Sequence, residues 1–143
     1  MMQQGRCEAT SANLGMRLVR LLLMDWIIGV TLALHMLGMA AIVGGFVAHR
    51  LGTAQAVIPL VWGARAQLVT GMVLVALNEA GAHRVSPAFW GVKLLVALAV
   101  VACAEMANVR TKRGVPSDML INVAIALTVL NVFIAVLWPE AVA

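Results

Sequence analysis

Four long apolar stretches constrain this chain more than any other feature of its sequence. They cover about residues 24–48, 57–78, 87–109 and 118–138. A helix of about 20 apolar residues crosses the roughly 30 Å hydrocarbon core of a bilayer, so each stretch is long enough to span it. The connections between them are short, which favours antiparallel neighbours. We therefore predict an all-α integral membrane protein, an up-down-up-down bundle of four transmembrane helices.

The composition excludes an ordinary water-soluble domain. Of the 143 residues, 63% are hydrophobic and 11% are charged, whereas soluble domains average about 45–50% and about 25%. The net charge of +4 comes from basic residues at the ends of the predicted helices, which suits lipid headgroups and not nucleic acid. We expect a multi-pass protein of the cell (plasma) membrane with the lipid bilayer as its partner. A homo-oligomer or a larger membrane complex is left open.

Local signals predict where the helices begin. Ser86 is a good N-cap, and Pro87 follows it at the first position of the third helix. Ser117 is expected to cap the fourth helix. Residues 1–15 are polar and small, without a hydrophobic period, and are expected to form a disordered tail before a membrane domain at 16–143.

The tryptophans agree with the predicted topology. Trp26, Trp90 and Trp138 fall at the start of the first helix, the start of the third and the end of the fourth. In an antiparallel bundle these three ends share one membrane face, where an aromatic belt is expected. Trp62 lies near the opposite face. Basic residues are divided evenly between the two faces, so the orientation in the membrane stays open.

Several polar side chains fall inside the predicted spans. An ionisable group costs roughly 2.5–3.5 kcal/mol at the centre of a membrane helix, so its presence calls for a reason. The helical rise of about 1.5 Å per residue places polar groups from all four helices within about 12 Å of depth. We predict an intramembrane polar pocket formed by His35, Arg65, Thr70, Lys93 and Asn131.

These residues also have a structural interpretation. Lys93 lies one turn inside its helix, from where its side chain reaches the headgroups. Arg65 is interfacial if the second helix begins at Trp62. Asn131 is of a type that forms hydrogen bonds between membrane helices. His35 has two equally good interpretations. It is either a neutral imidazole that forms a hydrogen bond to a neighbouring helix or a ligand-binding residue.

A soft-metal site is one cofactor hypothesis. His35, Met36 and Met39 lie close together on the first helix, and thioethers suit Cu(I), although ordinary packing also accounts for the methionines. Haem is the other hypothesis, with His35 as an axial ligand, but the other three predicted helices contain no histidine. Copper and haem are therefore both left open. No Ser-His-Asp, paired-carboxylate or phosphate-loop constellation occurs, which favours a protein that is not an enzyme.

Small residues on the first helix predict a close helix contact. Gly38, Ala41 and Gly45 lie on one side of it, and small residues at such spacing let the backbone of a neighbouring helix approach. His35 borders this side.

Short motifs between residues 34 and 110 carry a family resemblance. They are Leu34-His35, Gly44-Gly45, Arg65 with Thr70-Gly71, Trp90-Gly91-Val92-Lys93-Leu94-Leu95 and Asn108-Val109-Arg110. In these motifs the chain resembles the CopD-like (copper-resistance protein D) membrane superfamily and, more distantly, the HemJ-type protoporphyrinogen oxidases.

The resemblance implies the four-helix fold and a pocket around His35, Arg65 and Lys93. The chain departs from the pattern at Ile42, where an aromatic residue usually precedes the glycine pair, and near Ala104, where HemJ-type enzymes have a second histidine. CopD relatives are linked to copper handling, so the resemblance implies a non-catalytic accessory, assembly or metal-handling membrane protein. The alternative is a haem- or quinone-linked membrane oxidoreductase of the HemJ type.

Overall fold

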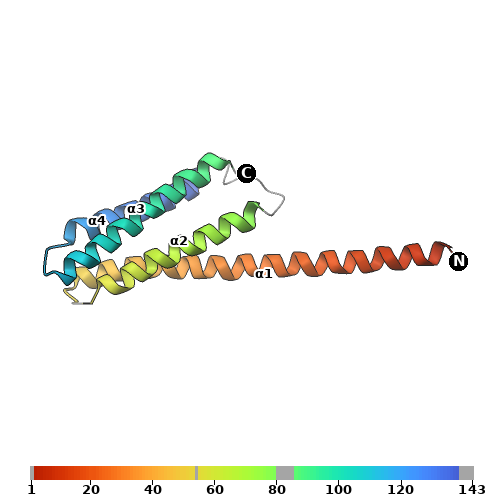
Figure 1. Ribbon diagram of the computed structural model, residues 1–143, viewed down its shortest axis with the longest axis horizontal. Helices are drawn as coiled ribbons and strands as arrows, with labels where there is room; N and C mark the ends of the chain where they lie inside the picture. Colours follow the sequence, from red (N-terminus) through yellow and green to blue (C-terminus); the bar gives the residue numbers. More distant parts are fainter. Residues whose placement is uncertain (1, 54, 80–85, 139–143) are drawn as a thin grey trace.

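The computed structural model of the protein is a bundle of four helices (Figure 1). It describes residues 2–53, 55–79 and 86–138, with side chains from Gly15 onward. The helices are α1 (Met2–Arg50), α2 (Val57–Glu79), α3 (Pro87–Lys112) and α4 (Asp118–Leu137). Neighbours along the chain run in opposite directions, which confirms the predicted all-α, four-helix bundle.

All four helices are long and apolar enough to cross a membrane. The apolar spans are Gly15–Arg50 within α1, then Val57–Glu79, Pro87–Lys112 and Asp118–Leu137. Large hydrophobic side chains remain exposed along all of them, as expected where the surrounding solvent is lipid. The chain is a small multi-pass membrane protein.

The first helix is longer than its sequence pattern suggested. It begins at Met2, not near residue 24, so the structure gives the expected disordered tail, residues 1–15, as helix from Met2 onward. No proline occurs within α1, so no proline ring interrupts its backbone hydrogen bonds. The N-terminal half of α1 extends beyond the other three helices (Figure 1).

The starts of α3 and α4 differ in how they are capped. Ser86 Oγ accepts a hydrogen bond from Phe89 N at 3.4 Å, as the Ser-Pro signal predicted. Ser117, in contrast, makes no side-chain cap bond to α4. Its hydroxyl lies 2.9 Å from Thr111 Oγ1 on α3. Ser117 is therefore the N-cap residue of α4 by position, as predicted, but its buried hydroxyl bonds to the preceding helix instead of to the backbone of α4.

Glycines let α1 and α2 approach closely. An added Cβ on Gly63 would lie 2.7 Å from the carbonyl oxygen of Gly38 and 2.8 Å from the backbone nitrogen of Ile42. A Cβ on Gly45 would lie 2.7 Å from the backbone nitrogen of Leu60. The close contact predicted from the small residues of α1 is thus confirmed. We call these contacts the glycine seam.

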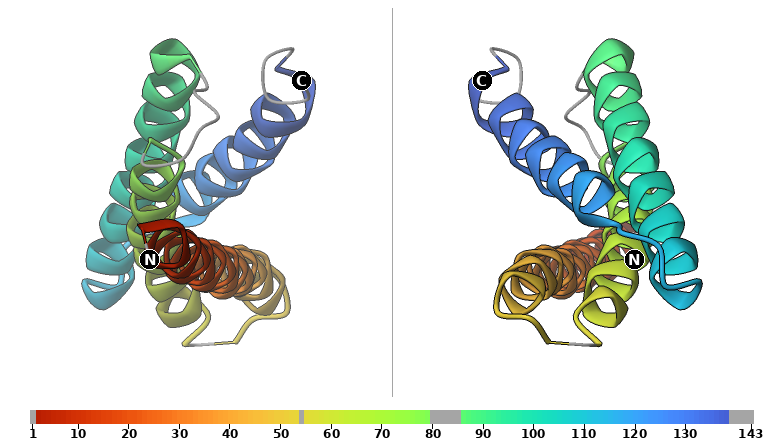
Figure 2. Two further views of the ribbon diagram at one scale, coloured as in Figure 1. Left: turned by 90° about the vertical axis from the view of Figure 1, so that its right-hand side faces the viewer. Right: turned by 90° about the vertical axis from the view of Figure 1, so that its left-hand side faces the viewer.

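The helices contact one another more closely at one end of the bundle than at the other. At one end, α1 meets α4 through His49 Nε2 and Asp118 Oδ1 at 2.8 Å and through Arg50 and Asn122 at 2.9 Å. Elsewhere α1 and α4 make little contact, whereas α1 packs extensively on α2. Towards the other end the helices diverge (Figure 1), and Figure 2 shows α3 and α4 spreading apart.

Aromatic side chains bridge the divergent end. Phe89 on α3 is buried, with its ring centroid 5.7 Å from that of Trp138 at the end of α4 and 5.0 Å from that of Trp90. The start of α3 and the end of α4 therefore share one face of the bundle, as the tryptophan positions predicted. This arrangement leaves a space between the helices behind the aromatic contact.

Candidate functional site

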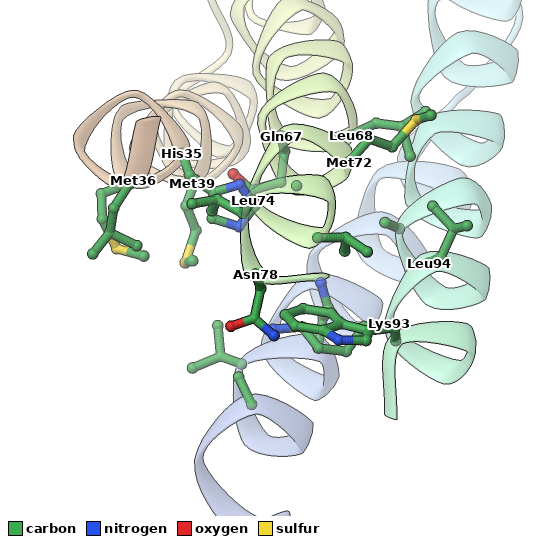
Figure 3. A pocket seen from close by; sticks show the side chains of 18 of the residues that line it. His35, Met36, Met39, Gln67, Leu68, Met72, Leu74, Asn78, Lys93 and Leu94 are labelled. Atoms are coloured by element: carbon green, nitrogen blue, oxygen red, sulfur yellow. The ribbon is translucent and has the colours of Figure 1, made fainter. Parts of the chain in front are cut away.

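A cavity of about 530 Å³ lies between the four helices (Figure 3). Most of its lining is apolar, and every helix contributes side chains. Ligand pockets commonly fall between about 300 and 1,000 Å³ and are mostly apolar with a few polar groups, so this cavity has the size and character of one. Its polar lining residues are His35, Gln67, Asn78, Trp90, Lys93, Thr128 and Asn131.

The histidine is held between α1 and α2 by two hydrogen bonds. Its Nδ1 lies 2.9 Å from Thr70 Oγ1, and its Nε2 lies 2.9 Å from Gln67 Nε2. The hydroxyl of Thr70 donates its only proton to the carbonyl oxygen of Ala66 at 2.6 Å. Thr70 must therefore accept from His35 Nδ1–H, while the amide of Gln67 donates to Nε2. This bonding makes His35 a neutral imidazole with its proton on Nδ1.

The inner end of the cavity, which we define by Gln67, Thr128 and Asn131, has acceptors without donors. Gln67 Oε1 and Asn131 Oδ1 are buried and have no hydrogen-bond partner among the described residues. Both residues and Thr128 border a small space of about 10 Å³. One water needs about 10–15 Å³, and a single water there would donate to both oxygens.

The outer end, which we define by Asn78, Trp90 and Lys93, has the opposite character. Asn78 Nδ2 and Trp90 Nε1 are buried donors with no partner among the described residues. The Lys93 ammonium lies 5.2 Å from the centroid of the Phe89 ring and forms no ion pair within the described part of the chain. In Figure 3 the side chains of Asn78 and Lys93 lie at the same end of the cavity. Three N–H donors thus line the outer end.

The structure brings together most, but not all, of the residues of the predicted pocket. His35, Lys93 and Asn131 line the cavity. Thr70 does not line it but forms a hydrogen bond with His35. Arg65 lies elsewhere: its Nε donates to Glu105 Oε1 on α3 at 2.6 Å, and its side chain is 46% exposed. Arg65 therefore belongs to the outer surface, because its helical position turns it away from the cavity.

The predicted pocket lacked four polar residues that line the cavity, Gln67, Asn78, Trp90 and Thr128. A signal for two of them was present, because Gln67, Gly71, Leu74 and Asn78 follow one another at intervals of four, three and four residues. This spacing marks one face of a helix. Trp90 precedes Lys93 by three residues and shares its face in the same way.

The suggested metal ligands do lie together at the cavity. His35, Met36 and Met39 all line it, and Figure 3 shows both methionine side chains on the same side of α1. Both ring nitrogens of His35 are already hydrogen-bonded, so a metal or haem iron would have to displace Gln67 or Thr70. No cluster of three His, Cys, Asp or Glu side chains suited to a metal occurs in the described part of the chain. With both hydrogen bonds in place, His35 has no free ring nitrogen for copper or haem iron.

Searches against protein-family models, curated proteins and solved structures found no match to this chain.

Proposed function

We propose that this chain is a non-catalytic membrane protein that binds a small amphipathic molecule inside its four-helix bundle. It would act in the plasma membrane as an accessory or assembly component of the CopD-like type. The single observation that carries the proposal is the cavity of about 530 Å³, whose wall residues carry four polar atoms that have no partner among the described residues.

Unpartnered polar groups are the reason to infer a ligand. A buried donor or acceptor without a partner costs about 1–3 kcal/mol, and in lipid no water compensates for it. Gln67 Oε1 and Asn131 Oδ1 can share one water in the small space between them. Asn78 Nδ2 and Trp90 Nε1 belong to residues that line the large cavity. A ligand with polar and apolar parts would satisfy them.

Metal handling and redox catalysis remain the alternatives that the family resemblance implies. Copper would use His35, Met36 and Met39, and haem would use His35. Both require His35 to give up a hydrogen bond of 2.9 Å. A ligand bound by the outer end of the cavity requires no such change, and for this reason we favour it.

The test is the molecule that accompanies the protein from its native membrane. The full chain would be purified in a mild nonionic detergent, and its extract analysed by mass spectrometry, metal analysis and a visible spectrum. Ala135→Phe would place a bulky ring in the cavity and obstruct it, because Ala135 lines it. Ala126→Phe is the matched control, since Ala126 is exposed on the same helix.

We expect one small amphipathic molecule per protein, retained in the Ala126→Phe variant and lost in Ala135→Phe. Stoichiometric copper that disappears in His35→Ala would favour the metal-handling alternative instead. A Soret band lost in the same variant would favour the oxidoreductase. If both phenylalanine variants retain the same molecules as the wild type, the cavity is not the binding site and the proposal fails.

A further inference from the structure

We propose that the outer end of the cavity binds the anionic head of a single-chain amphiphile, a carboxylate or a phosphate, with its apolar tail lying along the cavity. The inference rests on the proposed function and assigns the chemistry of the ligand. It depends on the kinds of atoms at the outer end, on the charge there and on the shape of the cavity.

The buried polar atoms at the outer end that lack a partner among the described residues are donors. They are the amide nitrogen of Asn78 and the indole nitrogen of Trp90, and Lys93 adds an ammonium group to the cavity wall. An indole nitrogen and an ammonium have no acceptor capacity at all. A ligand that satisfies these donors must therefore present acceptors to them. Ionised carboxylates and phosphates do so, and hydrogen bonds to them are about twice as strong as neutral ones.

The charge at the outer end is uncompensated in the described structure. Lys93 is half-buried and lies about two turns inside α3, where an unpaired charge is unfavourable. Asp25 and Glu79 lie towards the same membrane face, yet neither forms an ion pair with Lys93 within the described residues. The ring of Phe89 gives the ammonium only partial compensation at 5.2 Å. An anionic group would complete the pair.

The rest of the cavity suits an apolar tail. From Asn78 to Gln67, both of which line it, the axis of α2 rises about 16 Å. Between them the wall is made of aliphatic side chains from all four helices, among them Leu32, Leu74 and Val132. Asn78 is in the last turn of α2 and Trp90 in the first turn of α3, so the head would lie near the membrane surface and the tail would point inward.

Quenching of tryptophan fluorescence tests both the site and the orientation. In the variant Trp26→Phe, Trp62→Phe, Trp138→Phe, Trp90 is the remaining tryptophan. The full chain is measured in a nonionic maltoside detergent, which contains no phosphate. The probes are dodecanoate with bromine beside the carboxylate, dodecanoate with bromine at the tail end, and brominated dodecanol. The variant Trp26→Phe, Trp138→Phe is the matched control, because it keeps Trp90 and restores Trp62, which is 63% exposed and does not line the cavity.

We expect saturable quenching of Trp90 by the dodecanoate brominated beside its carboxylate, weaker quenching by the tail-brominated form, and no additional saturable quenching when Trp62 is restored. Lys93→Met should weaken binding at least about tenfold, because one charge-assisted hydrogen bond is lost. Lys93→Gln should weaken it as well. Lys112→Met replaces the only other lysine, at the far end of α3, and should leave binding unchanged.

Competition separates the two sources of an anionic head. If added lysophosphatidylglycerol, which has a single acyl chain, reverses the quenching, and Lys93→Met abolishes that reversal, the head is a lipid phosphate. If only free dodecanoate binds, it is a carboxylate. Equal saturable quenching by dodecanol, unaffected by Lys93→Met, would overturn the anionic head while the proposed function stands. Absence of saturable binding by every probe, together with no co-purifying molecule, would overturn both.

Discussion

The glycine seam makes a quantitative prediction for Gly63→Ala. The new Cβ would lie 2.7 Å from the carbonyl oxygen of Gly38, 2.8 Å from the backbone nitrogen of Ile42 and 2.9 Å from the Cβ of Ala41. Two of these atoms belong to the backbone, so no side-chain rotation relieves the clash. The two helices must separate, and overpacking of this kind typically costs about 1–3 kcal/mol.

A matched glycine removes the effect of helix propensity from the measurement. Alanine is favoured over glycine in a helix by up to about 1 kcal/mol, and this gain offsets part of the clash. Gly91 lies within α3, and a Cβ there would meet nothing within 4 Å. Gly91→Ala therefore carries the propensity gain alone. The difference between the two variants isolates the clash, and we expect Gly63→Ala to be less stable by about 1–3 kcal/mol.

Reversible unfolding in mixed micelles, with increasing fractions of sodium dodecyl sulfate, measures this difference by circular dichroism. Gly45→Ala should behave like Gly63→Ala, because its Cβ would lie 2.7 Å from the backbone nitrogen of Leu60. Gly71→Ala should cost little, since its nearest contact is His35 Cε1 at 3.4 Å. The close approach of α1 and α2 is refuted if Gly63→Ala unfolds at the same detergent fraction as Gly91→Ala, or at a higher one.

Two further predictions concern the polar groups. Nitrogen NMR of His35 should show a neutral ring protonated on Nδ1. Thr70→Val should shift the Nδ1 resonance, because the variant removes the hydroxyl that accepts the Nδ1–H hydrogen bond. A ring protonated on Nε2 alone would contradict these hydrogen bonds. Arg65→Glu should lower the detergent fraction at the midpoint of unfolding, because it places two carboxylates together between α2 and α3. Adding Glu105→Arg should restore most of the lost stability. If the exchange restores nothing, the ion pair does not hold these helices.

Sequence reasoning predicts the parts of this structure that depend on a single helix. Apolar length identifies the spans, and the Ser86-Pro87 pair identifies the start of α3, because these signals act within a few residues. The same holds for the small residues of α1, whose spacing alone marks a close contact. Depth along a helix is also local, and it correctly grouped His35, Lys93 and Asn131 at one cavity.

The differences from prediction concern how one helix faces another. Depth placed Arg65 near the other polar groups, but depth does not specify the angle around the helix axis, and the side chain turns outward to Glu105. Ser117 fits the pattern of an N-cap, yet its hydroxyl bonds to Thr111, a partner that only the packing of α3 on α4 supplies. Both outcomes depend on the rotation of neighbouring helices, which a single sequence does not encode in any short motif.

The cavity exists because the contacts between the helices are unevenly distributed. α1 is held along α2 by the glycine seam, but it is held to α4 only near His49 and Asp118. Lipid supplies little hydrophobic force to close two apolar helices on each other, so the helices stay apart wherever no specific contact joins them. The aromatic contact between Phe89 and Trp138 joins α3 to α4 near the outer end. It follows that losing this aromatic contact altogether should change which ligands enter, whereas changes at the glycine seam should act mainly through stability.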